Sequence, residues 1–256
     1  MVLLHRAELD RATGRSASAL QKVNACLCMY PEHQSALFLQ EQLQQRLSRW
    51  RANPWYDADG IREADLSLEP LDALHVPAWL HQNRDINISN MAGLPALSDD
   101  EEAKAYLAHV AQINGVEYAV IHHDYGLVGA VGLRCLEDMA HVHFWIGVDY
   151  QGRGFGKHAM QLLIRSLKKT HLLRDVFTTV NRDNLRSRRV LHACGFHVLT
   201  HETRGEGQDY LFMHLALQAT DMCTSQREIE RRLSRMCEEI GEPLSEIESY
   251  TNQRSE

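Results

Sequence analysis

Several features are missing from this sequence of 256 residues, and each absence excludes a class of protein. No apolar run approaches the roughly 20 residues that a membrane-spanning helix needs. The first residues lack the basic, apolar and small-residue regions of a signal peptide, so we expect none. Acidic residues outnumber Lys and Arg by 34 to 27, which gives a net charge of −7. Because binding to phosphate backbones draws on surplus positive charge, general affinity for nucleic acid is not expected.

Paired cysteines are also missing. The six cysteines are scattered, and only Cys26 and Cys28 lie close together, one residue apart. That spacing is too tight for a routine disulfide or zinc knuckle. We therefore expect reduced thiols, no metal site and a cytoplasmic location.

The composition that remains is that of an ordinary globular protein, with 44% hydrophobic and 24% charged residues. Four regions differ in their pattern. Residues 1–50 have helical periodicity, and 51–62 are predicted to be a linker because they contain Pro, Gly, Asn and Asp. Residues 63–218 alternate between strand and helix patterns, and 219–256 contain an amphipathic helix.

The N-terminal region is predicted to be a helical hairpin that is broken once, at Pro31. Its small and apolar positions weakly resemble the rhythm of one tetratricopeptide unit: Ala7, Gly14, Ala19, Leu20, Val23, Cys26 and Pro31. Because one such repeat cannot bury its faces alone, the hairpin must pack on the main domain or on a second chain. It either has no binding role or presents a substrate peptide.

The C-terminal helix leaves a similar choice open. Ile229, Leu233, Met236 and Ile240 share one apolar face, and Gly241 is expected to end the helix. This face either docks on the core or forms a homodimer.

The third region predicts an α/β (α+β) fold, with a mixed, mostly antiparallel sheet flanked by helices. Residues 116–123, 126–136 and 141–148 are strand candidates joined by short turns, which favours an antiparallel meander. Before them we expect one helix that is interrupted near Pro77 and another that Ser98 opens.

The stretch FWIGVDYQGRGFGKHAM interrupts this pattern, because a strand runs through three alternate glycines within 152–156 into a helix. A helix start offers unpaired amides and a positive dipole end, which together favour an anion such as a diphosphate. Arg153 and Lys157 add positive charge. The spacing is not the Gly-x-Gly-x-x-Gly of dinucleotide-binding proteins, and His158 rules out a nucleotide P-loop.

The segment does fit the pattern Q-x-x-G-x-G/A from Gln151 to Gly156. Downstream, VNRDNLRSRRVLHACGF fits V-x-x-x-N-x-x-S-x-x-V-L-x-x-x-G-F from Val180 to Phe196. Together with the strands before them, these motifs resemble the GNAT family of N-acyltransferases, and most of all the branch with the ribosomal-protein alanine N-acetyltransferases. The resemblance covers roughly residues 63–217 and implies the GNAT fold, with acetyl-CoA as co-substrate.

In that family the strand before the loop parts from the next strand, and the pantetheine of CoA pairs with its backbone. The resemblance assigns acyl-CoA binding to Ile146, Val148, Gln151, Gly152, Arg153, Gly154, Phe155, Gly156, Lys157, Asn181, Asn184 and Ser187. A nearby group of four arginines is either a solvated helix face or a contact for the CoA phosphates. The four are Arg182, Arg186, Arg188 and Arg189.

Acyl transfer to an amine needs a general base, because only the neutral amine has a free lone pair. Relatives often carry Glu where this chain has His141, and His143 lies on the same face of that strand. These histidines either act as base or simply fill a polar groove. Ser187 or Cys194 is a candidate proton donor, because Leu191 stands where many relatives have tyrosine.

Three residues on the last predicted hairpin, Glu202, Asp209 and His214, are alternative bases. Trp79 and residues 81–95 occupy the place where the family builds its acceptor pocket. The leading hypothesis is an N-acetyltransferase that acts on a primary amine of a protein or peptide. One alternative is acylation of a peptide natural product or small amine, with an acetyl group or a longer acyl chain. Another is a catalytically silent CoA-binding module.

Overall fold

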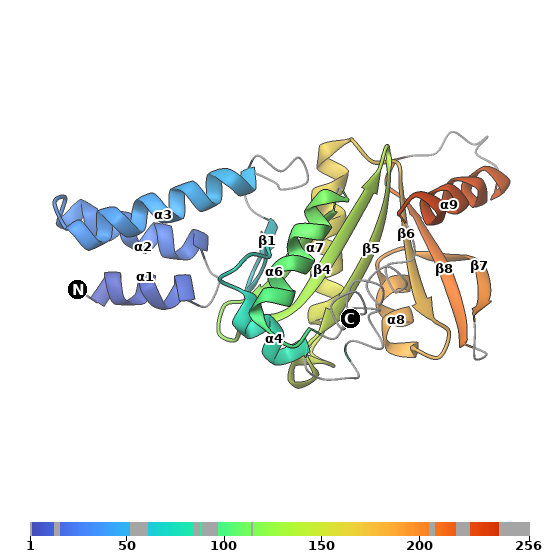
Figure 1. The fold of residues 1–256 in the computed structure, drawn as a ribbon, viewed down its shortest axis with the longest axis horizontal. Coiled ribbons are helices and arrows are strands. Elements are labelled where there is room, and N and C mark those ends of the chain that lie inside the picture. The colour runs from blue at the N-terminus through green and yellow to red at the C-terminus, as the bar shows by residue number, and fades with distance from the viewer. Residues whose placement is uncertain are drawn as a thin grey trace, which may run out of the picture.

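The computed structural model describes residues 2–12, 16–51, 61–83, 88, 97–113, 115–204, 208–218 and 226–240. Within them, eight strands form one sheet in the order β1-β2-β3-β4-β5-β6-β8-β7 (Figure 1). The strands are β1 (Ile61–Glu63), β2 (Leu66–Pro70), β3 (Gly115–His122), β4 (Gly126–Leu136), β5 (Met139–Ile146), β6 (Asp175–Asn181), β7 (His197–Arg204) and β8 (Gln208–Ala216). Neighbouring strands are antiparallel except for β5 and β6, which are parallel. The predicted mixed, mostly antiparallel sheet is confirmed.

Helices cover both faces of this sheet (Figure 1). Helices α4 (Val76–Asn83) and α6 (Asp100–Gln112) lie on one face, and α7 (Phe155–Thr170) lies on the other. A short 3₁₀ turn, η1 (Val148–Tyr150), joins β5 to the loop before α7, and α8 (Leu185–Ala193) follows β6. Each face buries its own apolar cluster, so the sheet is packed on both sides.

The two helices that precede the meander begin differently from the prediction. Pro77 is the second residue of α4, where a backbone N–H is not needed, so it does not interrupt the helix. The N-cap of α6 is Asp99, whose Oδ1 accepts hydrogen bonds from the amides of Glu101 and Glu102, both at 2.9 Å. Ser98 instead donates its amide and hydroxyl to the Glu102 carboxylate, at 2.8 and 2.9 Å. The prediction that Ser98 opens this helix is wrong by one residue.

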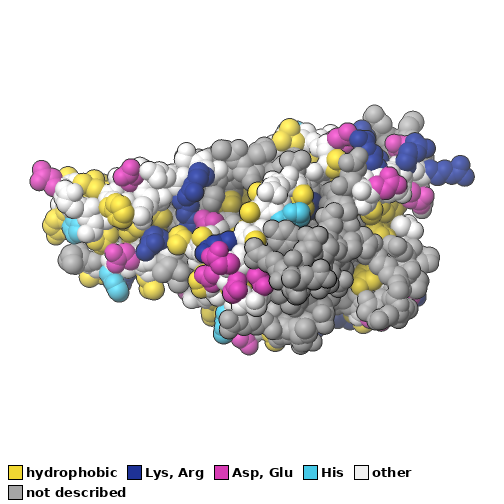
Figure 2. Space-filling model, viewed as in Figure 1, with side chains coloured by type: hydrophobic (Ala, Val, Ile, Leu, Met, Phe, Trp, Pro, Cys, Tyr) yellow, Lys and Arg dark blue, Asp and Glu magenta, His cyan; other side chains and the backbone are white. Residues whose placement is uncertain are grey.

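Three helices form an arm at the β1 edge of the sheet (Figure 1). They are α1 (Val2–Ala12), α2 (Ser16–Met29) and α3 (Gln34–Arg51), so the predicted hairpin corresponds to α2 and α3, with a further helix before it. Apolar side chains of the arm form a cluster of their own. The surface of the arm also carries exposed hydrophobic side chains, among them Leu9, Met29, Tyr30 and Phe38 (Figure 2).

A buried polar junction attaches the arm to the main domain. Arg46 on α3 is only 4% exposed, and its Nε and Nη2 lie 2.5 and 2.6 Å from the two carboxylate oxygens of Asp72. Its Nη1 donates to the Ser16 hydroxyl at 2.6 Å, and the Ser16 amide donates to Glu69 at 3.3 Å. The arm therefore packs on the main domain. Of the predicted linker, 52–60 lie outside the described residues, and Ile61 already belongs to β1.

The last helix, α9 (Gln226–Ile240), docks on the opposite end of the molecule from the arm (Figure 1). Leu233 and Met236 pack in a cluster with Met139, Phe177 and Phe212 of the sheet. Of the two alternatives for this apolar face, docking on the core is the one observed. None of the described helices is long and apolar enough to cross a membrane.

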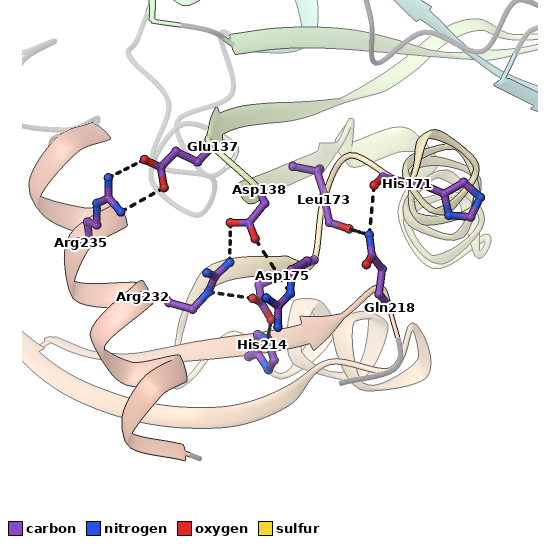
Figure 3. Close-up of polar contacts among 10 residues, drawn as sticks. Glu137, Asp138, His171, Leu173, Asp175, His214, Gln218, Arg232 and Arg235 are labelled. Carbon is purple, nitrogen blue, oxygen red and sulfur yellow. Dashed lines mark hydrogen bonds and ion pairs between the residues drawn. The ribbon is translucent and has the colours of Figure 1, made fainter. Parts of the chain in front are cut away.

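Ion pairs surround this contact. Arg232 lies 2.7 Å from Asp138 and 2.9 Å from Asp175, and Arg235 makes two contacts with Glu137 at 2.7 and 3.0 Å (Figure 3). The turn between β4 and β5 and the start of β6 therefore share the helix as a common partner.

Candidate active site

The parallel strands β5 and β6 pair only at their beginnings. Their register joins Met139 to Asp175, Ala140 to Val176 and His141 to Phe177, and ends there. On its other edge β6 stays paired with β8 as far as Asn181. The two parallel strands therefore separate toward their carboxyl ends, which frees backbone groups on both.

A groove of about 980 Å³ occupies this separation. Its walls come from the end of β5, η1, the glycine loop, the start of α7 and the start of α8. The lining residues are Ile88, Phe144, Trp145, Ile146, Val148, Tyr150, Gln151, Gly152, Gly154, Phe155, Gly156, Lys157, Asp183, Asn184, Leu185, Arg186, Ser187, Arg189 and Val190. Apolar side chains of β5 line the groove, and Lys157 of α7 and Arg186 and Arg189 of α8 bring positive charge to it.

The glycine loop presents unpaired amides to this groove. The first intrahelical bond of α7 runs from the amide of His158 to the carbonyl of Gly154, at 3.1 Å. The amides of residues 155–157 therefore have no acceptor within the helix, as at any helix start. Gly152 and Gly154 have φ values of 77° and 85°, and a Cβ on either would find no atom within 4 Å. These two positions need glycine because of the backbone conformation, and the space beside them is open.

Gly156 is glycine for a different reason. It lies inside α7, and a Cβ there would come within 3.2 Å of the Phe144 ring and 3.4 Å of Ile146. The missing side chain lets α7 pack close against β5. The loop thus combines two positions of positive φ that face open space with one position of tight packing.

Gln151 connects the walls of the groove. Its side-chain amide donates to the carbonyl of Ile146 at 3.0 Å, and its Oε1 accepts a hydrogen bond from Arg186 at 3.1 Å. The predicted arginine group divides at this point. Arg186 and Arg189 line the groove. By contrast, Arg182 pairs with Asp209 at 3.1 Å, and Arg188 donates to the Arg182 carbonyl at 2.8 Å.

All but two of the residues assigned to acyl-CoA binding line the groove. The exceptions are Arg153 and Asn181. The Arg153 guanidinium lies over the ring of Tyr125, 5.3 Å from its centroid, and Asn181 accepts a hydrogen bond from the amide of Asp183 at 2.8 Å. Asn184 lines the groove and also caps α8, since its Oδ1 accepts from the Ser187 amide at 3.0 Å.

The two histidines proposed as base lie on the sheet face opposite α7. His141 belongs to the last β5–β6 pair, and its Nε2 is 3.2 Å from the Thr179 hydroxyl. His143 lies beyond that pair, two residues before Trp145, which lines the groove. Neither histidine lines the groove itself, and His143 is the closer of the two in sequence to the point where the groove begins.

A buried polar cluster lies behind His143. The Oε1 atom of Glu117 on β3 is 3.2 Å from His143 Nε2, 3.0 Å from Arg134 Nη2 and 3.1 Å from the Tyr106 hydroxyl, which donates to it. Burial alone would raise the pKa of Glu117, but His143 and Arg134 outweigh it and lower the pKa to about 2. Burial and the Glu117 charge raise the pKa of Tyr106. The carboxylate is therefore ionised and surrounded by donors.

Other predicted groups have different surroundings. Burial raises the pKa of the Cys194 thiol to about 11, which disfavours a thiolate there, whereas Ser187 lines the groove. His214 is buried and lies 2.7 Å from Asp175, away from the groove. The side chain of Glu202 lies outside the described residues.

The predicted acceptor pocket is only partly described. Trp79 is 1% exposed and belongs to the core cluster under α4 and α6. Within residues 81–95, positions 84–87 and 89–95 lie outside the described residues, and Ile88 lines the groove. Sequence reasoning missed Phe144 and Tyr150, which flank the motif residues. Their nearness in sequence to Gln151 is the one signal that could have indicated them.

The geometry so far defines a protein with a split parallel strand pair, a groove in the separation and a helix start whose amides point to it without helical acceptors. A family model described as an acetyltransferase (GNAT) domain matches residues 65–197, just over half of the chain. The chain belongs to the GNAT acetyltransferase family. A comparison with curated proteins gives no significant match.

Solved structures share the fold at low identity. A spermidine N-acetyltransferase from Vibrio cholerae, in complex with CoA and spermine, is 19% identical, with a TM-score of 0.55 over 60% of this chain and 97% of that one. RimL, a ribosomal L7/L12 α-N-protein acetyltransferase in complex with CoA, is 17% identical, with a TM-score of 0.56 over 62% and 97%. A ribosomal-protein-S5-alanine acetyltransferase from Vibrio fischeri is 16% identical, with a TM-score of 0.54 over 62% and 97%.

Proposed function

We propose that this protein is an N-acetyltransferase that moves an acetyl group from acetyl-CoA to a primary amine of a protein or peptide. The observation that carries the proposal is the groove between β5 and β6, which ends at the unpaired amides of α7. A groove of this kind suits a long ligand with a diphosphate at one end and a thioester at the other.

The residues present fit such a ligand. The amides of 155–157 and the start of α7 would hold the diphosphate, and Lys157, Arg186 and Arg189 would add positive charge around it. The open edge of β5 after His141 would pair with the pantetheine arm, because its backbone groups have no partner on β6 there. The apolar side chains at the β5 end would surround the thioester.

The reaction then needs the amine in its neutral form. The amine nitrogen forms a bond to the acetyl carbonyl carbon while the bond from that carbon to sulfur breaks, and the electron pair leaves with the thiolate. A base must take the proton that the nitrogen loses. We assign this role to His143, because it lies beyond the point where β5 and β6 separate and on the face away from α7.

We choose the class of amine by comparison with the solved structures that share the fold. Two of those described above act on ribosomal proteins and one on spermidine, which makes a peptide amino terminus and a polyamine the two amines to compare. We favour the peptide, because the arm formed by α1–α3 adds exposed apolar surface of the kind that peptides use.

The test is turnover of acetyl-CoA with a panel of peptides that differ in their first residue, with spermidine and with small monoamines. Released thiol and the mass of the product are measured together. We expect acetylated peptide, and we expect turnover to fall by about 10²-fold or more in His143→Ala, the contribution typical of a positioned base. Tight binding of acetyl-CoA without transfer to any amine would instead indicate a silent CoA-binding module. Faster transfer from longer acyl-CoAs would identify the donor as another thioester.

A further inference from the structure

Three residues of the sheet form one row across three strands on the face away from α7. Glu117 on β3 pairs with Gly132 on β4, and Gly132 pairs with His143 on β5. A Cβ built on Gly132 would lie 1.9 Å from Cε1 and 2.3 Å from Nε2 of His143, and 2.7 Å from Glu117 Oε1. The imidazole therefore lies across β4, over the position where any other residue would have a side chain. Glycine at 132 is what lets a histidine of β5 reach a carboxylate two strands away.

The carboxylate at the end of this row is held firmly. Glu117 is 5% exposed, and its Oε1 also lies within 3.0 Å of Arg134 Nη2 and 3.1 Å of the Tyr106 hydroxyl. Arg134 in turn donates to the Tyr106 oxygen at 3.2 Å. These groups come from β4 and α6, so two separate elements each contribute a donor to the Glu117 carboxylate. The carboxylate cannot move without breaking several bonds to buried groups.

The row has a direct consequence for the chemistry of the ring. Nε2 of His143 is buried from solvent and lies 3.2 Å from Glu117 Oε1, an ion-pair contact that is not an aligned hydrogen bond. A lone pair on Nε2 would face the negative carboxylate at this distance, so the contact favours the tautomer with its proton on Nε2. The surroundings of one ring nitrogen thus select the tautomer. In the neutral ring, Nδ1 then keeps its lone pair.

We infer that Glu117 is a positioning residue that fixes the orientation and tautomer of His143, so that Nδ1 is the atom that accepts the proton of the amine. Gly132 belongs to the same arrangement, because the absence of a side chain there leaves room for the imidazole to lie across β4. The inference rests on the proposed function, in which His143 is the base. The Glu117 carboxylate stays ionised throughout, and the proton passes from the amine nitrogen to Nδ1.

Two variants separate this role from a merely structural ion pair. Glu117→Gln keeps the shape but replaces the charged acceptor with an amide, and Gly132→Ala pushes the ring away while leaving both partners in place. We expect each variant to lower kcat about tenfold or more, which is part of the rate increase that a positioned base contributes. The KM for acetyl-CoA should change by less than about twofold, because neither residue lines the groove. In Glu117→Gln the acid limb of kcat/KM should move to lower pH, because a base that loses a neighbouring negative charge releases its proton more readily.

The matched control is Glu69→Gln, the same change at a glutamate of β2 that is also 5% exposed but belongs to the arm junction. Its kcat and pH profile should match the wild type. In a His143→Ala background, Gly132→Ala should cause no further loss, because its effect acts through the imidazole. Full additivity of these two substitutions, or a pH profile of Glu117→Gln identical to that of the wild type, would overturn the inference. Should Glu117→Gln fail to fold, Gly132→Ala decides the question alone.

A second measurement does not depend on any amine. In ¹⁵N-labelled protein, the ring signals of His143 are assigned by their loss in His143→Ala, and their shifts report the tautomer. We expect the proton of the neutral ring on Nε2 in the wild type and a mixture of tautomers in Gly132→Ala. A neutral ring with its proton on Nδ1 overturns the inference even if the acetyl acceptor is still unknown. Absence of turnover with the expected tautomer counts against the proposed function alone.

Discussion

At the scale of single residues, the glycine loop separates two physical needs that the sequence motif merges. Gly152 and Gly154 adopt positive φ angles beside open space, whereas Gly156 permits close packing of α7 on β5. Replacing a glycine of the first kind should strain the backbone by roughly 1 kcal/mol and also place a methyl group where the ligand is expected. Replacing Gly156 should disturb packing first.

This difference gives a prediction for Gly154→Ala. We expect affinity for acetyl-CoA to fall by about tenfold or more, which corresponds to about 1.4 kcal/mol, with only a small decrease in the melting temperature. Isothermal titration and thermal unfolding measure the two quantities. The matched control is Gly195→Ala, which also replaces a glycine with positive φ, at 93°, but outside the groove. It should lower stability and leave affinity unchanged. Equal losses of affinity in both variants would contradict the account of the loop.

Glu117 provides a prediction about pH. Its pKa in the folded protein is about 2, lowered from 4.5 because His143 and Arg134 outweigh the effect of burial. A carboxyl group with a lowered pKa stabilises the folded state above the unfolded value, and this contribution is lost as the pH falls toward the folded value. Between about pH 5 and pH 2 the wild type should therefore lose on the order of 3 kcal/mol that Glu117→Gln does not lose. Urea unfolding at several pH values measures this difference. Parallel curves for the two proteins would contradict it.

The contrast between these residues explains what the sequence could predict at this scale. Gln151 and the glycines lie within six positions, so a local motif was enough to predict the loop. Glu117, Gly132 and His143 come together only through the register of three strands, and a shift of one residue would turn each side chain to the other face. No local pattern carries that register. Arg46 was missed for the same reason, since its partners Asp72 and Ser16 lie far from it in the sequence.

At the scale of elements, the separation of β5 from β6 depends on how their beginnings are held together. The first residues of both strands are joined by three register pairs, and α9 covers this end with Leu233 and Met236. Arg232 binds Asp138 before β5 and Asp175 at the start of β6. We therefore expect α9 to hold the closed end of the strand pair.

A truncation in α9 tests this role. Met236 is 1% exposed, so Met236→Ala should cost about 2–4 kcal/mol of stability, the usual range for a large side chain removed from a core. The exposed Ser234 on the same helix is the control, and Ser234→Ala should change stability by less than about 0.5 kcal/mol. Denaturant unfolding measures both. A Met236→Ala protein as stable as the control would show that α9 is not packed as described.

The elements themselves were the most predictable part of the fold. The three strands of the meander and the helix after the glycine loop follow from apolar runs and turns that are local in the sequence. The docking of α9 did not follow, because an apolar helix face indicates burial without indicating its partner. The extra helix α1 was missed because its apolar residues are not concentrated on one face of the helix.

At the scale of the whole molecule, a polar junction centred on the buried Arg46 and the half-buried Asp72 attaches the arm to the acetyltransferase domain. Arg46 is surrounded by Asp72, Ser16 and the ring of His75, whose Nδ1 lies 3.4 Å from Nη2. Removing one partner of a buried pair leaves the other charge without compensation, which is costly. The junction is remote from the groove, so its effects on stability and on ligand binding should be separable.

Arg46→Leu tests this separation. We expect the free energy of unfolding to fall by about 2–3 kcal/mol. This is less than for a fully enclosed ion pair, because the Asp72 side chain is 31% exposed. Hydrogen exchange should become faster in α1–α3, while the affinity for acetyl-CoA stays within about twofold of the wild type. Lys104→Met, which removes an exposed ion pair with Glu101, is the control and should change neither quantity. Unchanged exchange in the arm would show that this junction does not attach it.

The most direct test of the central claim is a crystal structure of the protein with acetyl-CoA bound. The account predicts the diphosphate against the amides of residues 155–157 and the pantetheine arm between β5 and β6, with the thioester near the end of β5. A structure in which the separation between these strands is empty, with the ligand bound elsewhere or absent at saturating concentration, would contradict it.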